Sequence, residues 1–426
     1  MIEWVDDENV ELKPAYLVVV QQPYDDASEA EAMLDELEQL SESIDLEVLG
    51  GEIVKLRKPN ARLFVGKGKA EEIANTCRSL GVEVIIFDDE LSPYQQRNWE
   101  TLTGMSVIDR SQVIIDIFAH RAETVEARLQ VKLASLKYSL PRLARAWTHL
   151  SRQAGGAGSG VRGVGEQQIE LDRRMIKEEI RKVEKGLKDV RRNRETQRKQ
   201  RGRQSVSTAA IVGYTNSGKS SLLNHFTKAG VLEADKLFAT LDPSTKPVLL
   251  PDNHTLLLTD TVGFVSKLPH LLVEAFKATL EEAVVADFLV HIVDASSPHM
   301  DEHIRVTREV LEEIGAEMQD IMLVFNKVDL VEDRFFLDLI ERKHPDAHFI
   351  SARTGEGTEE LLELMSKYIH RTMRPVKLRV PQHDGKVMSL LHNTSVIIDK
   401  EYDGNDIVIK AKVSPAVLKN VIQYQA

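Results

Sequence analysis

The chain has 426 residues, which is enough for roughly three domains, and its 42% hydrophobic and 29% charged residues are typical of a soluble globular protein. Its single cysteine, Cys77, excludes an intramolecular disulfide, and no apolar run approaches the roughly 18 residues that a membrane span needs. Residues 1–8 are acidic and lack the apolar segment of a signal peptide, so we expect a cytoplasmic protein.

The formal net charge of −12 is unevenly distributed along the chain. Residues 1–60 carry 16 acidic and 4 basic side chains, whereas residues 172–203 carry 14 basic and 6 acidic ones. Residues 121–152 are also basic, with 7 basic and 2 acidic side chains. This asymmetry favours a polyanionic partner for the basic part. Long helices with a charged solvent face would explain it equally well.

Residues 1–110 alternate between strand-like and helix-like segments, which predicts a small α/β domain. We expect strands over residues 15–22, 46–56, 62–65, 82–87 and 106–108, and helices over residues 29–44, over 69–80 and from residue 92. The stretch Gly66-Lys67-Gly68-Lys69 lacks the spacing of a phosphate-binding fingerprint, so we interpret it as a plain turn.

Residues 111–203 are predicted to form a basic helical hairpin, because two apolar seams recur at three- and four-residue steps. The first seam is Val125, Leu129, Leu133, Leu136, Leu140, Leu143, Trp147 and Leu150. The second is Ile169, Ile176, Ile180, Val183, Leu187 and Val190. Pro141 lies inside the first seam and should kink or interrupt that helix. Residues 191–204 are basic without periodicity and predict a hinge into the next domain.

The loop between these helices, residues 155–165, contains six glycines. One interpretation is a flexible linker. We prefer a loop that enters a narrow RNA cavity, because Arg162 lies among the glycines and Arg152, Arg173 and Arg174 flank them.

The central motif follows an apolar run, residues 209–212, and has the spacing G-x-x-x-x-G-K-[ST]. It consists of Gly213, Tyr214, Thr215, Asn216, Ser217, Gly218, Lys219 and Ser220. Such a loop cradles phosphates with its backbone N–H groups, while the lysine contacts the β- and γ-phosphates and the final hydroxyl can ligate Mg²⁺. The motif therefore predicts a nucleoside triphosphate site.

The motifs that follow have the order of a Ras-like G domain over residues 204–372. The first group comprises Phe238, Ala239, Thr240, Leu241, Asp242 and Pro243, and the second Asp260, Thr261, Val262 and Gly263. Thr240 is expected to complete Mg²⁺ coordination when triphosphate is bound, and Asp260 to hold an Mg²⁺-bound water. The Gly263 N–H is expected to contact the γ-phosphate, so we assign catalytic roles to Lys219, Thr240 and Gly263.

Two further motifs indicate the base. They are Asn326, Lys327, Val328 and Asp329, and, after another predicted strand, Ser351, Ala352 and Arg353. Asp329 can accept hydrogen bonds from guanine N1–H and the exocyclic amine, and adenine would leave this carboxylate unpaired. We expect Asn326 to join this loop to the phosphate loop, Lys327 to lie along the base and the Ala352 N–H to donate to O6. The predicted ligand is GTP or GDP.

Two positions depart from the Ras pattern. Phe264 follows Gly263 where a glutamine would orient the attacking water, so we expect slow intrinsic hydrolysis unless another side chain substitutes. Asn216 can ligate K⁺ beside the phosphates; the alternative is an asparagine that only forms the turn.

Residues 373–426 are predicted to form a small α/β docking module, with strands over residues 376–380, 395–398 and 407–412 and a turn at Asp403-Gly404. Its partner is not indicated by the sequence.

The combination of the glycine-rich loop, Asp172-Arg173-Arg174, the phosphate loop, the Phe238–Pro243 stretch and Asp260-Thr261-Val262-Gly263-Phe264 resembles the HflX family of the Obg–HflX group. The match extends over the first three predicted domains and is closest to enterobacterial members. The resemblance implies a GTPase that binds the large ribosomal subunit and splits or rescues stalled ribosomes, notably under heat stress. It also implies that residues 155–165 approach the peptidyl-transferase region of rRNA, and that a hydrophobic residue at position 264 is a family trait.

Three functional hypotheses follow. The first is a GTP-dependent switch on the ribosome. The second is an RNA-remodelling ATPase centred on the N-terminal domain with a regulatory G domain, although residues 1–200 contain no recognisable adenine-binding motif. The third is a regulatory adaptor for a protease. We expect a monomer.

Overall fold

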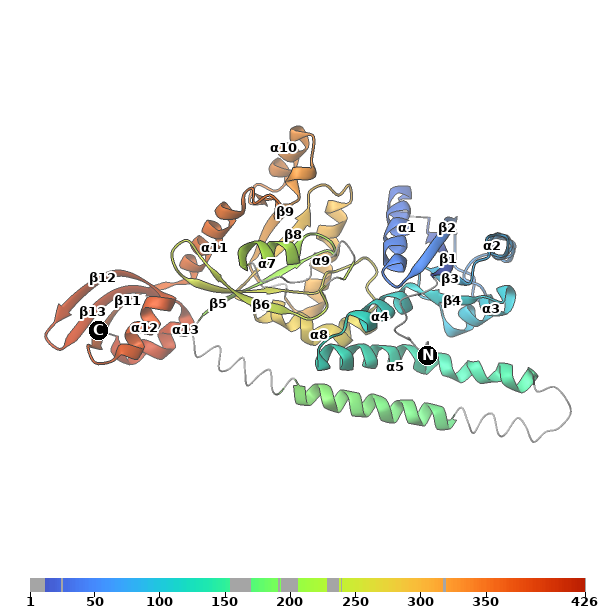
Figure 1. Cartoon of the computed structure of the whole chain (residues 1–426), viewed down its shortest axis with the longest axis horizontal. Helices are drawn as coiled ribbons and strands as arrows, with labels where there is room; N and C mark the ends of the chain where they lie inside the picture. The colour runs from blue at the N-terminus through green and yellow to red at the C-terminus, as the bar shows by residue number, and fades with distance from the viewer. Residues whose placement is uncertain are drawn as a thin grey trace. The chain divides into compact units, whose positions relative to one another are not determined.

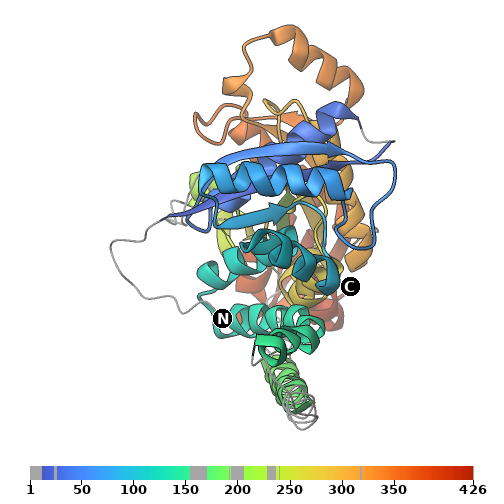
Figure 2. The same cartoon turned by 90° about the vertical axis from the view of Figure 1, so that its right-hand side faces the viewer.

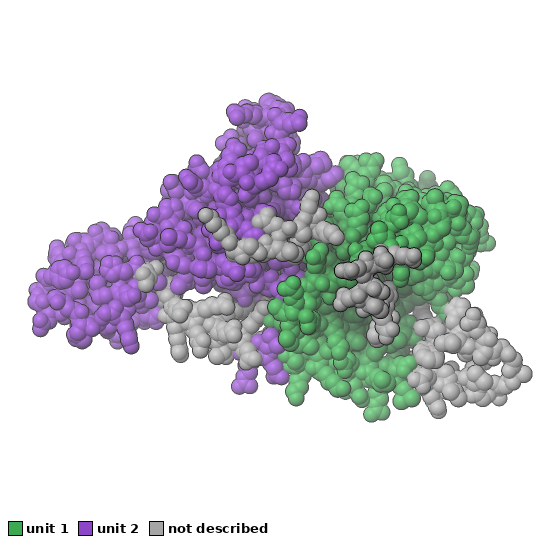
Figure 3. Space-filling model, viewed as in Figure 1, with its two compact units in different colours: residues 1–187, 236–238, 266–276 green, residues 188–235, 239–265, 277–426 purple. Residues whose placement is uncertain are grey.

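The computed structural model describes residues 12–23, 26–153, 170–190, 192, 206–227, 237–238, 240–316 and 319–425. The chain divides into two compact units, which Figure 3 colours separately. Unit 1 comprises residues 1–187, 236–238 and 266–276, and unit 2 comprises residues 188–235, 239–265 and 277–426. Among the described helices, none has the length and apolar character to cross a membrane.

Unit 1 contains a four-stranded parallel sheet in the order β2-β1-β3-β4. Its strands are β1 (Lys13–Gln21), β2 (Leu46–Lys55), β3 (Val84–Phe87) and β4 (Ser106–Asp109). Its helices include α1 (Ala27–Glu42), α2 (Lys67–Leu80) and α3 (Pro93–Thr103). These elements are coloured blue to teal and lie toward the viewer in Figure 2. β1 and β3 are nearly continuously buried, because helices cover both faces of a parallel sheet.

The predicted α/β alternation is confirmed, but the strand predicted over residues 62–65 is wrong. Asn60 Oδ1 accepts the backbone N–H of Arg62 at 2.8 Å, and Phe64 has a φ of 65°. An asparagine that bonds two residues ahead stabilises a turn instead of a strand. The predicted plain turn at Gly66 is the start of α2, with Gly66 as its N-cap.

Helices α4 (Arg110–Arg121) and α5 (Val125–Gln153) follow, and α5 packs beside the helix formed by residues 170–190 (Figure 1). Lys132 Nζ lies 2.6 Å from Glu179 Oε1, and Leu133 clusters with Val183 and Leu187. The predicted antiparallel hairpin is thus confirmed for the described residues. Pro141 lies inside α5 and does not interrupt it, and the adjacent Arg142 side chain donates to the Tyr138 carbonyl at 3.0 Å.

Unit 2 contains a six-stranded sheet in the order β10-β9-β8-β5-β7-β6. Its strands are β5 (Ser207–Gly213), β6 (Ser244–Leu249), β7 (Thr255–Asp260), β8 (Phe288–Asp294), β9 (Ile321–Asn326) and β10 (His348–Phe349). All pair in parallel except β6, which is antiparallel to β7 at the edge, as expected from the sequence. The helical elements are α7 (Lys219–Thr227), α8 (His270–Val285), α9 (Met300–Ile314), the 3₁₀ turn η1 (Val328–Leu330), α10 (Arg334–Lys343) and α11 (Thr358–Thr372).

The core of this sheet explains its order. Leu222 and Leu223 of α7 pack with Leu361 and Met365 of α11 against apolar residues of the central strands. β5 and β8 are buried along almost their whole length, which is typical of central strands covered on both faces. The Ras-like α/β fold is therefore present, and its predicted motifs follow the carboxyl ends of β5, β7, β9 and β10.

The C-terminal part of unit 2 is a three-stranded antiparallel sheet in the order β11-β13-β12. Its elements are β11 (Arg374–Pro381), α12 (Gly385–Thr394), β12 (Ser395–Asp403), β13 (Asp406–Val413), α13 (Pro415–Val421) and η2 (Ile422–Tyr424). The predicted turn is confirmed, with Gly404 at a φ of 61° between β12 and β13.

Candidate nucleotide site

The phosphate loop connects the buried strand β5 to α7, and two of its positions require glycine. A Cβ on Gly213 would lie 2.2 Å from the Ile292 carbonyl oxygen, and one on Gly218 would lie 2.1 Å from Asn326 Nδ2. Gly218 also has a φ of 92°, which glycine adopts without strain. The glycines therefore let this loop pass close to β8 and to the loop after β9.

Lys219 begins α7 and is buried within the loop that precedes it. Its Nζ donates to the Tyr214 carbonyl at 2.6 Å. Burial lowers the pKa of Lys219 to about 8, while the nearby Asp260 carboxylate opposes the shift. A triphosphate at this loop would supply the anion that favours the charged ammonium.

Three oxygen-bearing side chains converge at the start of α7. Ser220 Oγ donates to Asp260 Oδ2 at 2.7 Å and lies 2.8 Å from Thr240 Oγ1. Asp260 is fully buried, and its Oδ1 has no hydrogen-bond partner among the described residues. Burial raises the pKa of Asp260, and Lys219 opposes this shift. Two hydroxyls and an unsatisfied buried carboxylate oxygen fit a hard cation such as Mg²⁺.

The segment after β7 is fixed against the phosphate loop by its backbone. The Thr215 N–H donates to the Phe264 carbonyl at 2.8 Å, and the Phe264 N–H donates to the Gly213 carbonyl at 3.1 Å. A Cβ on Gly263 would lie 3.0 Å from Lys219 Nζ, so Gly263 is next to the lysine that is predicted to contact phosphate. The Phe264 side chain is buried. This arrangement leaves the phenyl ring no means of orienting a water.

The loop after β9 is joined to the phosphate loop as expected. Asn326 Nδ2 donates to the Ser217 carbonyl at 2.8 Å, and Asn326 Oδ1 accepts the Ala352 N–H at 2.9 Å. The latter bond uses the N–H that we expected to donate to guanine O6. Lys327 has a φ of 65°, and its Nζ lies 2.6 Å from Asp294 Oδ2.

The carboxylate predicted to recognise guanine has a cationic neighbour. Asp329 Oδ2 lies 2.6 Å from Arg353 Nη2, and the Arg353 side chain is 75% exposed. Ser351 is fully buried, and its Oγ accepts the Thr354 N–H at 3.1 Å. Ser351 therefore shapes the loop that carries Ala352 and Arg353.

Several predicted nucleotide contacts lie in other surroundings. The Phe238 ring packs against Phe118 of α4, with the ring centroids 4.6 Å apart, and belongs to unit 1. The remaining apolar predictions, Leu241, Val262 and Val328, are buried, and Asp242 is partly buried. The hydroxyl of Thr261 donates to the Ile211 carbonyl at 2.6 Å. Asn216 has a φ of 56°, which is typical of a turn-forming asparagine.

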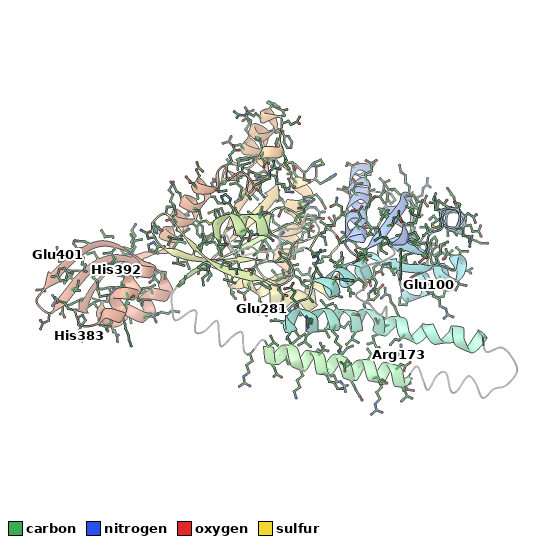
Figure 4. The ribbon with its side chains drawn as sticks, viewed as in Figure 1. Glu100, Arg173, Glu281, His383, His392 and Glu401 are labelled. Carbon is green, nitrogen blue, oxygen red and sulfur yellow. The ribbon has the colours of Figure 1, made fainter. Side chains whose placement is uncertain are left out.

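Part of the predicted site lies outside the described residues. Ala239 is one such residue, as is the glycine-rich loop with Arg162. On the helix of residues 170–190, Arg173 and Arg174 are exposed, and Figure 4 labels Arg173. The basic flank of the loop is thus accessible to solvent.

Sequence reasoning missed two histidines near the phosphate loop. The His303 ring of α9 stacks on Tyr214, with centroids 3.8 Å apart, and burial lowers its pKa to about 4. His291 of β8 is buried, and burial together with Arg308 and Lys219 lowers its pKa to about 3. No motif identifies either residue, because each functions through packing.

A buried ion-pair network in unit 1 was also missed. Lys267 Nζ lies 2.7 Å from Asp88 Oδ2 and 3.2 Å from Asp89 Oδ1. Asp88 also pairs with Arg110 at 2.6 Å. The pKa of Asp88 is lowered, because the cations beside it outweigh the opposing effect of burial. Since 179 residues separate Lys267 from Asp88, no local pattern could have predicted the pair.

Comparison with known proteins identifies the parts of the chain. Residues 31–119 match a family model described as "GTP-binding GTPase N-terminal", and residues 121–201 match "GTP-binding GTPase Middle Region". Residues 208–327 match the family described as "50S ribosome-binding GTPase". Together these ranges cover more than half of the chain.

Curated relatives match over nearly the whole length. The GTPase HflX of Akkermansia muciniphila is 44% identical over 419 residues, covering 96% of each chain. The Chlamydia pneumoniae protein is 43% identical and covers 91% of this chain and 82% of its own. The Escherichia coli protein is 42% identical and covers 89% of each. These three values do not single out an enterobacterial relationship.

Among solved structures, the SsGBP–GDP complex is 25% identical, with a TM-score of 0.46, and covers 84% of this chain and 98% of its own. The relatives and family models agree with the motifs at the carboxyl ends of the strands. The chain belongs to the HflX family of GTPases and hydrolyses GTP to GDP and phosphate.

Proposed function

We propose that this GTPase binds the large ribosomal subunit and couples GTP binding and hydrolysis to the splitting or rescue of stalled ribosomes, notably under heat stress. The observation that carries the proposal is the grouping of residues 236–238 and 266–276 with unit 1, which also contains α5 of the basic hairpin. These segments flank Thr240 and Gly263, so a change at the nucleotide has a direct chain connection to the unit with the hairpin. The match of residues 208–327 to the model described as "50S ribosome-binding GTPase" supports the partner.

At the nucleotide, we assign Mg²⁺ coordination to Ser220 and Thr240, with Asp260 acting through water. Bound Mg²⁺ would neutralise the developing charge on the phosphates. Lys219 and the Gly263 N–H contact the γ-phosphate in this proposal, and the closeness of Gly263 to Lys219 Nζ supports the assignment. Asp329 selects guanine through its carboxylate. The remaining predicted residues of the three loops position the backbone around these groups.

Thr240 links the nucleotide to unit 1 through Phe238. Phe238 lies two residues before Thr240, and its ring packs edge to face on Phe118. If triphosphate draws Thr240 into Mg²⁺ coordination, the short connection between Thr240 and Phe238 passes the movement to Phe238. The same nucleotide change acts on Lys267, which lies four residues after Gly263 and pairs with Asp88. Both segments therefore transmit the nucleotide state.

The signal can continue within unit 1 through a second set of polar contacts. Asp109 N-caps α4 through the Gln112 N–H, and the neighbouring Arg110 pairs with Asp88. Arg142 of α5 pairs with the same Asp109 at 3.0 Å. A shift of α4 would thus act on the second half of α5, which leads toward the glycine-rich loop. We infer that hydrolysis releases the ribosome through this linkage.

We propose that intrinsic hydrolysis is slow, because Phe264 is buried where a glutamine would orient water. Ligation of K⁺ by Asn216 is a proposal that the turnover rate in K⁺ and Na⁺ buffers tests. Equal rates at equal ionic strength would remove it. We further propose domain boundaries at residues 110, 203 and 372, a cytoplasmic location and a monomeric state.

The decisive experiment is single-turnover GTP hydrolysis with and without purified large ribosomal subunits. We expect a stimulation of at least about 100-fold, because a partner can supply water positioning or charge stabilisation that the chain lacks. Sucrose-gradient profiles with intact ribosomes then report splitting. Absence of stimulation would reject the proposal.

A parallel measurement of ATP hydrolysis addresses the alternative function. An N-terminal ATPase would retain ATP turnover in the Asp329→Asn variant while losing GTP-dependent activity. We expect instead that ribosome splitting is lost together with GTP binding.

A further inference from the structure

Two segments of unit 2 bring three ligating side chains together, away from the phosphate loop. Asp252 and His254 lie in the turn between β6 and β7, and His370 lies in the last turn of α11. One ligand atom from each residue falls within 4.8 Å of the other two. The turn places Asp252 and His254 on the same side, because the His254 N–H donates to Asp252 Oδ1 at 3.1 Å.

The three side chains meet at one carboxylate oxygen. His254 Nδ1 lies 3.0 Å from Asp252 Oδ2, and His370 Nε2 lies 2.7 Å from the same atom. The imidazole rings are nearly perpendicular, at 79°, with centroids 5.6 Å apart. Both rings therefore direct a nitrogen toward the same small volume.

A simple histidine–aspartate ion pair does not satisfy this group. His254 is 9% exposed, and neither of its ring nitrogens makes a hydrogen bond with the described residues. His370 Nε2 likewise approaches Asp252 without hydrogen-bond geometry. Buried imidazole nitrogens without a well-aligned hydrogen bond are costly unless a ligand takes a lone pair from each ring.

The Asp252 carboxylate also accepts an outer hydrogen bond, as ligating carboxylates in metal sites do. Ser366 Oγ donates to Asp252 Oδ2 at 2.6 Å, and Ser366 lies one helical turn before His370 on α11. An outer hydrogen bond of this kind orients a ligating carboxylate. His370 also lies at the carboxyl end of α11, where the helix dipole favours a cation.

We propose that Asp252, His254 and His370 form a binding site for a divalent transition metal, with Zn²⁺ as the ion that fits best. Two imidazoles and one carboxylate are a ligand set that Zn²⁺ accepts, with water as the fourth ligand. The site joins the edge hairpin β6–β7 to α11. Metal binding would therefore stabilise the edge of the nucleotide-binding sheet.

The test uses the full-length protein, freed of metal by a chelator and kept in excess Mg²⁺ and GDP so that the nucleotide site is filled. Zn²⁺ is titrated calorimetrically, and Co²⁺ is used as an optical probe. We expect one ion per chain, a higher melting temperature with Zn²⁺ and a Co²⁺ spectrum of a four-coordinate site without thiolate ligation. The single cysteine, Cys77, is buried in unit 1. Binding of Co²⁺ to Cys77 would add a thiolate band to the spectrum and so can be told apart from binding at the proposed site.

The variants His254→Gln and His370→Gln should each weaken Zn²⁺ binding by more than about 100-fold. Ser366→Ala should weaken it by about 10- to 100-fold and keep the stoichiometry, as loss of an outer hydrogen bond does. The matched control is His383→Gln, an exposed histidine that Figure 4 labels, and it should bind like the wild type. Melting temperatures without metal show whether each variant folds.

The proposal is overturned if the wild-type protein shows no stoichiometric Zn²⁺ binding. It is equally overturned if His254→Gln, His370→Gln and His383→Gln all bind Zn²⁺ as the wild type does. Because GTP hydrolysis is not the readout, neither result depends on the proposed ribosomal function.

Discussion

Single side chains in the loop proposed to recognise guanine are held by contacts with their neighbours. The Asp329 side chain is 12% exposed, and Arg353 neutralises it at 2.6 Å. Asn326 holds the same region to the phosphate loop. In the proposed site, guanine would pair with Asp329, whereas adenine would leave this carboxylate partly unpaired.

The Asp329→Asn variant should bind GTP at least about 100-fold more weakly, because each hydrogen bond to a charged group contributes about 1.5–3 kcal/mol. Xanthosine triphosphate, which carries a carbonyl in place of the exocyclic amine, should gain affinity because the asparagine amide can donate to it. Competition binding with both nucleotides measures the exchange. Asp338→Asn, an exposed aspartate on α10, is the control and should leave both affinities unchanged. Equal GTP affinity in wild type and Asp329→Asn would contradict the assignment.

His291 gives a prediction on acid stability. Its pKa is about 3 in the folded protein, against an ordinary 6.5, so the unfolded chain binds the extra proton as pH falls below 6.5. Stability from this residue is complete above pH 6.5 and decreases progressively toward pH 3. At pH 5 the loss amounts to about 2 kcal/mol.

The His291→Leu variant replaces the titrating imidazole with an apolar side chain of similar size. Between pH 7 and pH 5, its unfolding free energy should fall by about 2 kcal/mol less than that of the wild type. Chemical denaturation at the two pH values provides the comparison, and exposed His383→Gln is the control. Parallel losses in wild type and His291→Leu would show that His291 does not titrate as described.

At the scale of elements, the loops after β3 and β7 are held by one carboxylate with two unequal partners. The Asp88 side chain is fully buried between Arg110, which is 2% exposed, and Lys267, which is 33% exposed. Removing the shared Asp88 carboxylate takes one of two acidic partners from the buried Arg110, which keeps its ion pair with Glu36. Removing Lys267 leaves the buried Asp88 carboxylate still paired with Arg110, and the lost partner was partly screened by solvent.

Asp88→Asn removes the charge that Arg110 and Lys267 share and should destabilise unit 1 by about 3 kcal/mol, whereas Lys267→Met should cost no more than about 1 kcal/mol. Hydrogen exchange of the β1 and β3 amides in the full chain reports the opening free energy of unit 1. Similar losses of free energy in the two variants would refute the prediction that Asp88 contributes more to stability than Lys267.

Lys267→Met should instead uncouple unit 1 from the nucleotide. In the wild type we expect exchange of the amides in residues 85–115 to differ between the GTP-analogue and GDP complexes. This difference should shrink in Lys267→Met, while GTP affinity changes by less than about threefold. Lys343→Met, which removes an exposed pair with Asp301, serves as the control. A full difference in Lys267→Met would exclude coupling through this segment.

On the scale of the whole molecule, we expect the hairpin to bind the ribosome and the nucleotide site to carry out GTP hydrolysis. Arg162→Ala should reduce the stimulation of GTP turnover by large ribosomal subunits at least about tenfold at a fixed subunit concentration. If Arg162 contacts a phosphate, the salt dependence of binding should fall by about one in log–log slope. Turnover without ribosomes should not change.

The control for this experiment is Arg342→Ala, an exposed arginine of α10. Subunit binding measured by co-sedimentation over a range of salt concentrations gives the slope. Unaltered stimulation in Arg162→Ala would remove the loop from the proposed ribosome contact.

Motifs predicted where the phosphate loop lies in the fold, because their spacing is local in sequence. Gly213, Gly218 and Lys219 have fixed spacing: Gly213 ends the buried strand β5, and Lys219 begins α7. The prediction failed for residues 62–65, where Asn60 forms a turn that strand propensity does not reveal. Phe238 was grouped with the nucleotide contacts, but its ring packs on Phe118, which is a contact across more than 100 residues of sequence.

The sequence by itself determined the GTPase fold and the paired helical seams, because periodicity and short motifs express backbone geometry and local chemistry. Only the tertiary structure decided that Lys267 meets Asp88, that Phe238 belongs to unit 1, and that Asp252, His254 and His370 converge. These contacts join residues that are far apart along the chain. They form when packing of separate elements brings side chains together, and no local pattern encodes that pairing.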